Sequence, residues 1–249
     1  RRIVILVVVA FTAARFVAMG FNRIADRRID ARNPRTRGRE LPSRRLTVSQ
    51  AWASVLSAMV VFLFAAWALN PLCAALAPVA LIWVATYSYT KRFTSLSHLW
   101  LGAALAIAPV GGYVAVTGAW SDRPWLLLVI ALAVACWVAG FDIFYALQDE
   151  AFDRGEGLHS LVVRLGKEWA IIVAKVLHGV AIAALMLFGK EAGLGLPYFV
   201  AVALAVAVIG WEHRQVQPRD LSKLNAAFFT ANGVVSIVVF VGALIDRIV

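Results

Sequence analysis

Long apolar runs, each long enough to cross a bilayer, are the feature that most limits how this chain can fold. Eight such runs succeed one another through the 249 residues, separated by short polar connections. A spanning helix needs about 20 mostly apolar residues, and lipid offers backbone groups no hydrogen-bond partners, so helices are favoured. We expect helices at about 3–24, 47–69, 72–90, 97–117, 124–150, 167–189, 195–213 and 225–246. Asn70-Pro71, Gly118, Pro124, Gly193 to Pro197 and Pro218 punctuate these runs as turn or helix-start residues.

The composition agrees with a polytopic membrane protein. Hydrophobic residues make up 62% of the chain, against roughly half in a soluble domain. The net charge of +10 could indicate nucleic-acid binding, but in so apolar a chain basic residues are better explained by anionic lipid headgroups. We therefore expect a lipid bilayer and no nucleic acid as partner. The predicted fold class is all-α, a transmembrane helical bundle that forms a single domain over residues 1–249.

Basic residues alternate between connections as an eight-span topology demands. The connection at 23–45 holds nine Lys and Arg, and those at 91–92, 151–167 and 214–223 hold two, three and three, including Arg219 and Lys223. The connections between them carry only Arg123 and Lys190. Because cytoplasmic loops carry the excess of Lys and Arg, the basic group is expected to face the cytoplasm.

Carboxylates gather in two stretches that approach this same basic face. In the first, Asn22, Asp26 and Asp30 are spaced by four residues, so they share one face if the first helix continues through them. In the second, spacings of three, four and four again predict one helix face, which carries Asp142, Tyr145, Asp149 and Asp153.

Two such stripes predict a site for divalent cations. Clustered carboxylates repel one another unless positive charge neutralises them, and Mg²⁺ commonly takes one or two carboxylates together with phosphate oxygens and water. Facing stripes would suit two Mg²⁺ ions holding a diphosphate. The alternative is a set of solvated salt bridges with Arg23, Arg27, Arg28 and Arg154. The place of Asp142 inside an apolar helix argues against it, because an intramembrane carboxylate is costly and is a functional candidate.

The residues around both stretches resemble the two motifs of the UbiA prenyltransferases. Residues 15–47, RFVAMGFNRIADRRIDARNPRTRGRELPSRRLT, are similar to the NDxxDxxxD motif and its basic PRT…R.LPSG-like loop. Residues 142–166, DIFYALQDEAFDRGEGLHSLVVRLG, are similar to the YxxxDxxxD motif and its GLHS…R.G loop. The resemblance covers nearly the whole chain and is strongest to the 4-hydroxybenzoate polyprenyltransferase branch. Close relatives in that branch are also assigned to menaquinone synthesis by the futalosine route.

The family has nine transmembrane helices, and its first motif ends the second of them. Here that motif ends the first visible helix, and the chain begins at Arg1 without Met. We therefore expect eight visible spans of a nine-helix UbiA-type fold, with the first helix missing by N-terminal truncation. Two residues depart from the family pattern. Arg23 replaces the second acid of the usual ND pair, and Arg44 stands at the Gly of LPSG, where we expect an altered loop geometry.

The resemblance implies an enzyme that transfers a polyprenyl group from a polyprenyl diphosphate to an aromatic acceptor. The acceptor implied is 4-hydroxybenzoate or a related quinone precursor, and the cofactor is Mg²⁺. Charge neutralisation would help the diphosphate leave, and a dry pocket would protect the allylic cation from water. The metal ligands implied are Asn22, Asp26, Asp30, Asp149 and Asp153.

Basic side chains near these motifs are the expected contacts of the diphosphate or of an acceptor carboxylate, namely Arg15, Lys91, Arg92 and Arg164. Arg15 lies within a span, two turns before Asn22, and is expected to face the interior. Lys91 and Arg92 are equally well explained as topological charges, the explanation that we favour for Arg35, Arg37 and Arg39.

The remaining candidates have two possible roles each. Tyr145 is expected to hydrogen-bond a metal ligand or the diphosphate, although a packed aromatic residue explains it nearly as well. Asp142 is expected to orient the acceptor or to accept the ring proton. His159 could cap the site or only bond within its loop. His98, His178 and His213 share no pattern that assigns them a role.

We expect an integral protein of the bacterial inner membrane whose active site faces the cytoplasm. The alternative function is a membrane transporter with a cytoplasmic-side charged site. A transporter would more often place its charge near the midplane, beside broken helices, whereas here most of the charge lies at one face.

Overall fold

The computed structural model describes residues 1–216 and 224–248, apart from the side chains of 225–229, and no strand occurs among these residues. Arg219 and Lys223 of the fourth basic connection, and the predicted turn residue Pro218, lie outside the described part. The helices are α1 (Arg2–Arg32), α2 (Val48–Leu69), α3 (Pro71–Thr90), α4 (Ser97–Thr117), α5 (Pro124–Ala146), the 3-10 helix η1 (Leu147–Asp149), α6 (Glu150–Gly155), α7 (Leu161–Leu165), α8 (Lys167–Glu191), α9 (Leu196–Gln215) and α10 (Leu224–Ile248).

All eight predicted spans are confirmed as helices. Eight helices of the described part are long and apolar enough to cross a membrane. The ends match closely for most of them, but two differ from prediction in ways that matter. Helix α1 continues past position 24 to Arg32, and the fifth span leaves α-helical geometry after Ala146 instead of running to 150. Both differences fall on the acidic stretches.

Side-chain caps define several helix ends. Thr47 forms a capping box with Gln50 at the start of α2, in which each side chain bonds the other's backbone N–H. Asn70 accepts a hydrogen bond from the Cys73 amide at 2.8 Å, directly before Pro71 at the first turn of α3. Pro needs no donor there and has a preset φ, so the Asn-Pro pair ends one span and begins the next. Gly193 has a φ of 65°, which a residue without Cβ adopts at least cost.

The chain divides into two compact units, each described by itself. The first comprises residues 1–91 and 107–122, and the second comprises 92–106 and 123–249, so α4 contributes to both. In the first unit, α1 packs against α2 and α3 through Val17, Ile24, Val55 and Leu81. The Asn70 side chain also donates to the carbonyl of Val114 at 2.9 Å, which ties the end of α4 to the α2–α3 turn.

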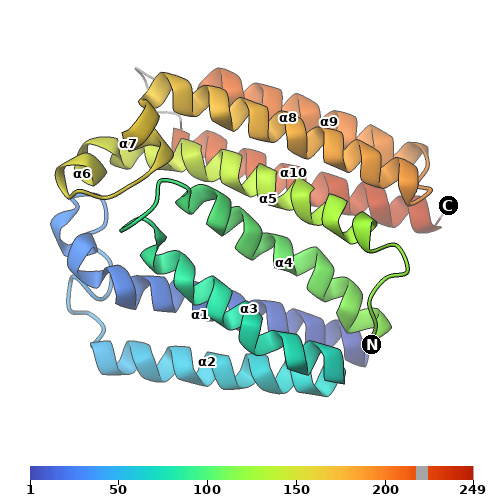
Figure 1. The fold of residues 1–249 in the computed structure, drawn as a ribbon, viewed down its shortest axis with the longest axis horizontal. Helices are drawn as coiled ribbons and strands as arrows, with labels where there is room; N and C mark the ends of the chain where they lie inside the picture. Colours follow the sequence, from blue (N-terminus) through green and yellow to red (C-terminus); the bar gives the residue numbers. More distant parts are fainter. Residues whose placement is uncertain (217–223, 249) are drawn as a thin grey trace. The chain divides into compact units, whose positions relative to one another are not determined.

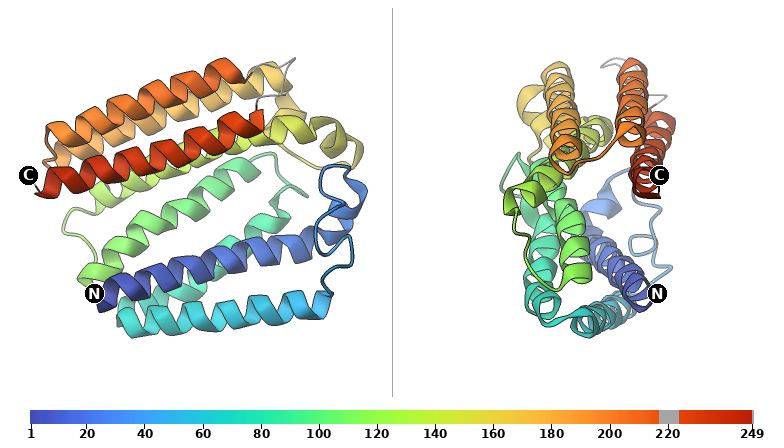
Figure 2. Two further views of the ribbon diagram at one scale, coloured as in Figure 1. Left: turned by 180° about the vertical axis from the view of Figure 1, so that it is seen from behind. Right: turned by 90° about the vertical axis from the view of Figure 1, so that its right-hand side faces the viewer.

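In the second unit, α5, α8, α9 and α10 run alongside one another (Figures 1 and 2). Lipid is as apolar as a side chain, so these helices associate by close packing at small residues more than by escape from water. Gly140, Gly189 and Gly242 each lie where an added Cβ would collide with a neighbouring helix. The core at the end that carries η1, α6 and α7 is formed by Ile143, Phe144, Leu147, Val162 and Ala174.

Large apolar side chains remain exposed along the spans, as expected of surfaces that face lipid. Trp67, Ile82 and Leu128 each expose more than two thirds of their surface. Soluble monomers rarely expose extended apolar patches, because water penalises them. Together with the eight spans, this identifies an integral membrane protein.

Enlarging Gly140 should destabilise the second unit. A Cβ at this position would strike the His178 ring, which is held by hydrogen bonds to His213 at 2.9 Å and to the Trp137 carbonyl at 3.2 Å. We expect overpacking in Gly140→Ala to cost about 1–3 kcal/mol and to lower the melting temperature in detergent by about 2–10 °C. Gly179→Ala is the control, since nothing lies within 4 Å of its Cβ position. Equal melting temperatures for the two variants would contradict this account of helix packing.

Candidate functional site

The first acidic stretch lies on the last turns of α1. The helix continues unbroken through Asn22, Asp26 and Asp30, so the predicted shared face is confirmed. Asn22 donates to an oxygen of Asp26 at 3.0 Å, and its amide also lies 3.5 Å from the hydroxyl of Ser88 on α3. The amide thereby fixes the rotamer of Asp26. The spacing of four, continued over two turns, is what brings these groups into contact.

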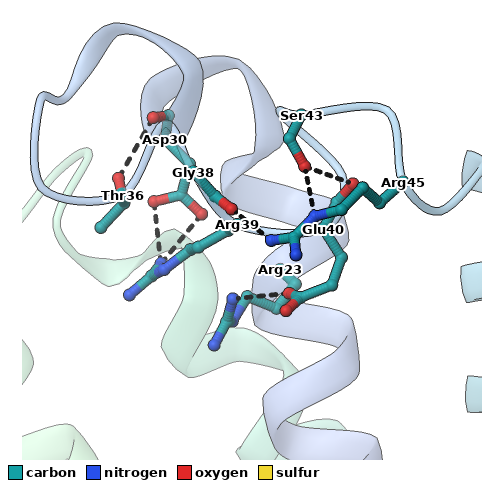
Figure 3. A network of polar contacts seen from close by, with 8 residues as sticks. All are labelled: Arg23, Asp30, Thr36, Gly38, Arg39, Glu40, Ser43 and Arg45. Atoms are coloured by element: carbon teal, nitrogen blue, oxygen red, sulfur yellow. Dashed lines mark hydrogen bonds and ion pairs between the residues drawn. The ribbon is translucent and has the colours of Figure 1, made fainter.

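Asp30 is buried and is held by an arginine from the following loop. Arg39 donates from Nη1 to both carboxylate oxygens at 2.9 Å, and Thr36 donates to the Asp30 carbonyl at 3.1 Å (Figure 3). Asp30 is 6% exposed. A carboxylate buried to this extent needs a charged partner, and Arg39 supplies it. The loop after α1 therefore folds back onto the carboxylate.

A second ion pair joins the same loop to an earlier turn of α1. Arg23 donates to Glu40 at 3.2 Å, and Arg45 donates to the Gly38 carbonyl at 2.6 Å (Figure 3). A hydrogen bond from its own backbone amide, reinforced by the charge of Arg23, lowers the pKa of the Glu40 carboxyl. Arg23 stands where the family pattern has an acid, and its partner here is Glu40 of the loop.

Arg44 occupies a backbone position that suits glycine. Its φ is 60°, in the left-handed region that a side chain disfavours. Arg44 thus has the left-handed backbone conformation that Gly adopts most easily. The presence of Arg at this position therefore does not require the change in loop geometry that we expected.

The second acidic stretch is not one continuous helix face, and that prediction is wrong. Asp142 and Tyr145 lie on α5, Asp149 ends the 3-10 helix η1, and Asp153 lies on the short helix α6. Asp149 and Asp153 are both buried, at 7% and 3% exposure. The break comes where Phe144 and Leu147 enter the apolar core of this unit.

Local hydrogen bonds hold the loop after α6. Arg154 donates to Glu150 at 2.9 Å and to the Val163 carbonyl at 3.0 Å, while the amide of Leu158 donates to the Asp153 carbonyl at 2.8 Å. The alternative of solvated salt bridges named Arg154 as a partner of the Asp residues, whereas the ion pair that it forms here is with Glu150. An open cleft of about 420 Å³ adjoins this loop and is lined by Phe93, Thr94, Ser95, His159, Ser160, Val163 and Arg164.

The predicted basic contacts lie in different surroundings. Arg164 is exposed, lines the cleft and donates to Ser95 at 3.3 Å. Lys91 caps the end of α3 in the first unit, and Arg92 is exposed at the start of the second. Arg15 is exposed on α1, two turns before Asn22, and its expected interior-facing position stays a prediction. Of the other candidates, His159 lies in the cleft and Tyr145 is partly buried.

Two residues next to the predicted carboxylates were not foreseen. Arg39, interpreted from sequence as a topological charge, is the partner of Asp30. His98, to which no role was assigned, lies with Nδ1 2.6 Å from Oδ2 of Asp142. The first pair is nine residues apart, from the end of α1 into the irregular loop, and the second is 44 residues apart on two helices, so no local pattern indicates either. The only sequence signal for His98 was a histidine in the first turn of an apolar span.

The donor sets fit magnesium bound through its substrate. Among the described residues, no group of three or more His, Cys, Asp and Glu side chains could hold a metal ion alone. Each motif instead contributes two carboxylates, Asp26 with Asp30 and Asp149 with Asp153. Mg²⁺ usually keeps water or phosphate oxygens beside one or two carboxylates, so such incomplete oxygen sets suit a metal–diphosphate complex.

Removing Arg39 should loosen the loop after α1. In Arg39→Gln, Asp30 loses two charge-assisted hydrogen bonds, and such bonds contribute about 1.5–3 kcal/mol when well buried. Arg39 itself is 26% exposed, so we expect amide hydrogen exchange across 33–46 to rise by about fivefold. Arg37→Gln, which changes an exposed arginine of the same loop, should leave the exchange unchanged. Equal exchange in both variants would refute the role given to Arg39.

Comparison with known proteins agrees with these motifs. The sequence profile of the UbiA prenyltransferase family matches residues 1–234. A curated relative from Alkalilimnicola ehrlichii, named 4-hydroxybenzoate octaprenyltransferase, is 30% identical over 249 residues, which cover 98% of this chain and 82% of the relative.

Solved structures show the same fold. A UbiA homologue from Aeropyrum pernix K1, in its apo form, superposes with a TM-score of 0.90 at 33% identity, covering 99% of this chain and 90% of the homologue. A UbiA homologue from Archaeoglobus fulgidus bound to DMAPP and Mg²⁺ has a TM-score of 0.73 at 19% identity, covering 100% of this chain and 88% of that homologue. The chain therefore belongs to the UbiA prenyltransferase family.

Proposed function

We propose that this protein transfers a polyprenyl group from a polyprenyl diphosphate to an aromatic acceptor in a Mg²⁺-dependent reaction. The observation that carries the proposal is the set of carboxylates at the two acidic motifs, of which Asp30, Asp149 and Asp153 are buried, in a membrane protein of the UbiA family. Clustered buried carboxylates favour a divalent cation and a polyanionic ligand. The Archaeoglobus homologue, which is bound to DMAPP and Mg²⁺, supports this choice of ligand and metal.

The residues proposed to hold the metal are Asn22, Asp26, Asp30, Asp149 and Asp153. When bound, Mg²⁺ would supply the positive charge that stabilises the departing diphosphate. Asn22 already orients Asp26 by a hydrogen bond, so this carboxylate is positioned in advance. An incoming cation would compete with Arg39 for the oxygens of Asp30. Tyr145 is proposed to bond the diphosphate or one of the metal ligands.

The reaction has three bond changes. The allylic C–O bond breaks and the diphosphate leaves with its electron pair, which produces an allylic cation. A π pair of the acceptor ring forms the new C–C bond at that cation. The ring C–H bond then breaks, its electrons restore aromaticity, and the proton passes to a base. Asp142 is proposed to orient the acceptor or to be that base, since its carboxylate lies on α5 one turn before Tyr145.

The acceptor proposed is 4-hydroxybenzoate or a related quinone precursor. Its hydroxyl group activates the ring positions beside it toward an allylic cation, and its carboxylate offers a partner for a guanidinium group. The name of the Alkalilimnicola relative supports this acceptor. Lys91, Arg92, Arg164 and Arg15 are proposed to bind the diphosphate or this carboxylate. The exposed position of Arg164 beside the cleft makes it reachable by a soluble acid.

We further propose that the acidic motifs face the cytoplasm in a bacterial inner membrane. The support is the excess of Lys and Arg in the connections that adjoin both motifs. Proteoliposomes give the test against the transporter alternative: solute flux without any prenylated product would favour transport.

Asp149→Asn should lower turnover by at least about 100-fold, because it removes charge stabilisation of the leaving group. The assay incubates membranes with Mg²⁺, a polyprenyl diphosphate and a panel of aromatic acids, and identifies products by mass spectrometry. Asp122→Asn, in the exposed connection between α4 and α5, is the matched control and should retain full activity. Retained activity in Asp149→Asn would argue strongly against this site.

Metal removal should abolish turnover reversibly. Chelation by EDTA is expected to stop product formation, and added Mg²⁺ should restore it, because the carboxylates repel a diphosphate unless a cation neutralises their charge. Binding of a non-reactive prenyl thiolodiphosphate should show the same dependence. Turnover that persists in chelated, metal-free membranes would exclude the proposed role of Mg²⁺.

A further inference from the structure

A buried histidine lies behind Asp142. His98 is in the first turn of α4 and belongs to the same unit as α5. Its Nδ1 lies 2.6 Å from Oδ2 of Asp142, a short hydrogen bond between side chains 44 residues apart. The His98 side chain is fully buried, whereas 17% of the Asp142 side chain is exposed. The imidazole therefore contacts the carboxylate from its buried side, while part of the carboxylate remains exposed.

The chemistry of the pair fixes which group donates. An ionised carboxylate can only accept, so Nδ1 of His98 must carry the proton. Nε2 of His98 and the hydroxyl of the adjacent Ser97 are both buried and have no hydrogen-bond partner among the described residues. A buried polar group with so few partners is costly. Within the described part of the chain, the hydrogen bond that the His98 ring makes is the one to Asp142.

Close helix packing holds the two side chains opposite each other. Gly102, one turn after His98, lies against the backbone of Ala135 on α5, where an added Cβ would collide with the Ala135 carbonyl oxygen. The small residue lets α4 approach α5 closely, and at this separation an imidazole reaches the carboxylate. The hydrogen bond thus results from helix geometry and not from a flexible loop.

We propose that His98 is a positioning residue for Asp142, whose second oxygen takes the proton lost by the acceptor ring. This inference rests on the proposed function. As the ring C–H bond breaks, its electron pair returns to the ring and its proton bonds to the free oxygen of Asp142. His98 keeps its Nδ1 proton throughout and holds the other oxygen. A positioned base contributes about 10²–10⁴-fold to a proton transfer.

The kinetic test compares His98→Leu, His98→Asn and Ser97→Ala with the unaltered protein, using geranyl diphosphate and 4-hydroxybenzoate as probes. We expect His98→Leu to lower kcat about 10–100-fold, less than the loss of the base itself because Asp142 remains, while KM for the diphosphate changes less than about twofold. Mg²⁺-dependent binding of geranyl thiolodiphosphate should be unchanged. His98→Asn should recover much of kcat, because its amide N–H can replace Nδ1. Ser97→Ala, at an equally buried neighbour, should behave like the unaltered protein.

A spectroscopic readout makes the test independent of turnover. Nitrogen NMR of histidine-labelled protein should show His98 with its proton on Nδ1, and Asp142→Asn should shift that resonance.

Normal kcat in folded His98→Leu would overturn the inference while the proposed function stands. Equal loss of kcat and of thiolodiphosphate binding, with no recovery in His98→Asn, would also overturn it, since that is the behaviour of a purely structural contact. If the unaltered protein alkylates no aromatic acid, the proposed function fails and this inference falls with it.

Discussion

Lipid cannot solvate a charge or an unpaired backbone group, and this constraint organises the molecule. The helices satisfy their own backbone groups over the spans, so polar side chains are concentrated where helices end. Both acidic motifs obey this rule, one on the last turns of α1 and the other at the junction of α5, η1 and α6. Chemistry that needs several carboxylates is thus confined to regions where connections can supply partners.

Carboxylates of both motifs have a partner suited to their surroundings. An amide holds Asp26, a guanidinium from a loop holds Asp30, and an imidazole from another helix holds Asp142. These partners differ in what they permit. The neutral amide orients a carboxylate without cancelling its charge, whereas Arg39 neutralises Asp30 and must share it with any cation. The acidic groups are therefore ordered before a ligand arrives, but they are not equally available to one.

Much of this arrangement could be predicted from the sequence because apolar runs, caps and charge alternation act locally. Asn70-Pro71 marked a helix junction correctly, and the spacing of Asn22, Asp26 and Asp30 gave their common face. The failures have non-local causes. A spacing of three, four and four fits a continuous helix, whereas the chain changes to 3-10 geometry beside Phe144 and Leu147, which pack in the core of this unit. The exposure of Arg15 likewise depends on packing between helices, which its place within an apolar span does not indicate.

The three residues of η1 also change the direction in which the side chains of α6 point relative to those of α5. A 3-10 helix advances about 120° per residue and an α-helix about 100°, so the insertion rotates α6 by roughly 60° relative to an unbroken helix. In ideal geometry Asp153 is therefore offset in azimuth from Asp142, although they are separated by only three turns of chain. One short segment can thereby present carboxylates toward two different ligands, which a straight helix with the same residues could not do.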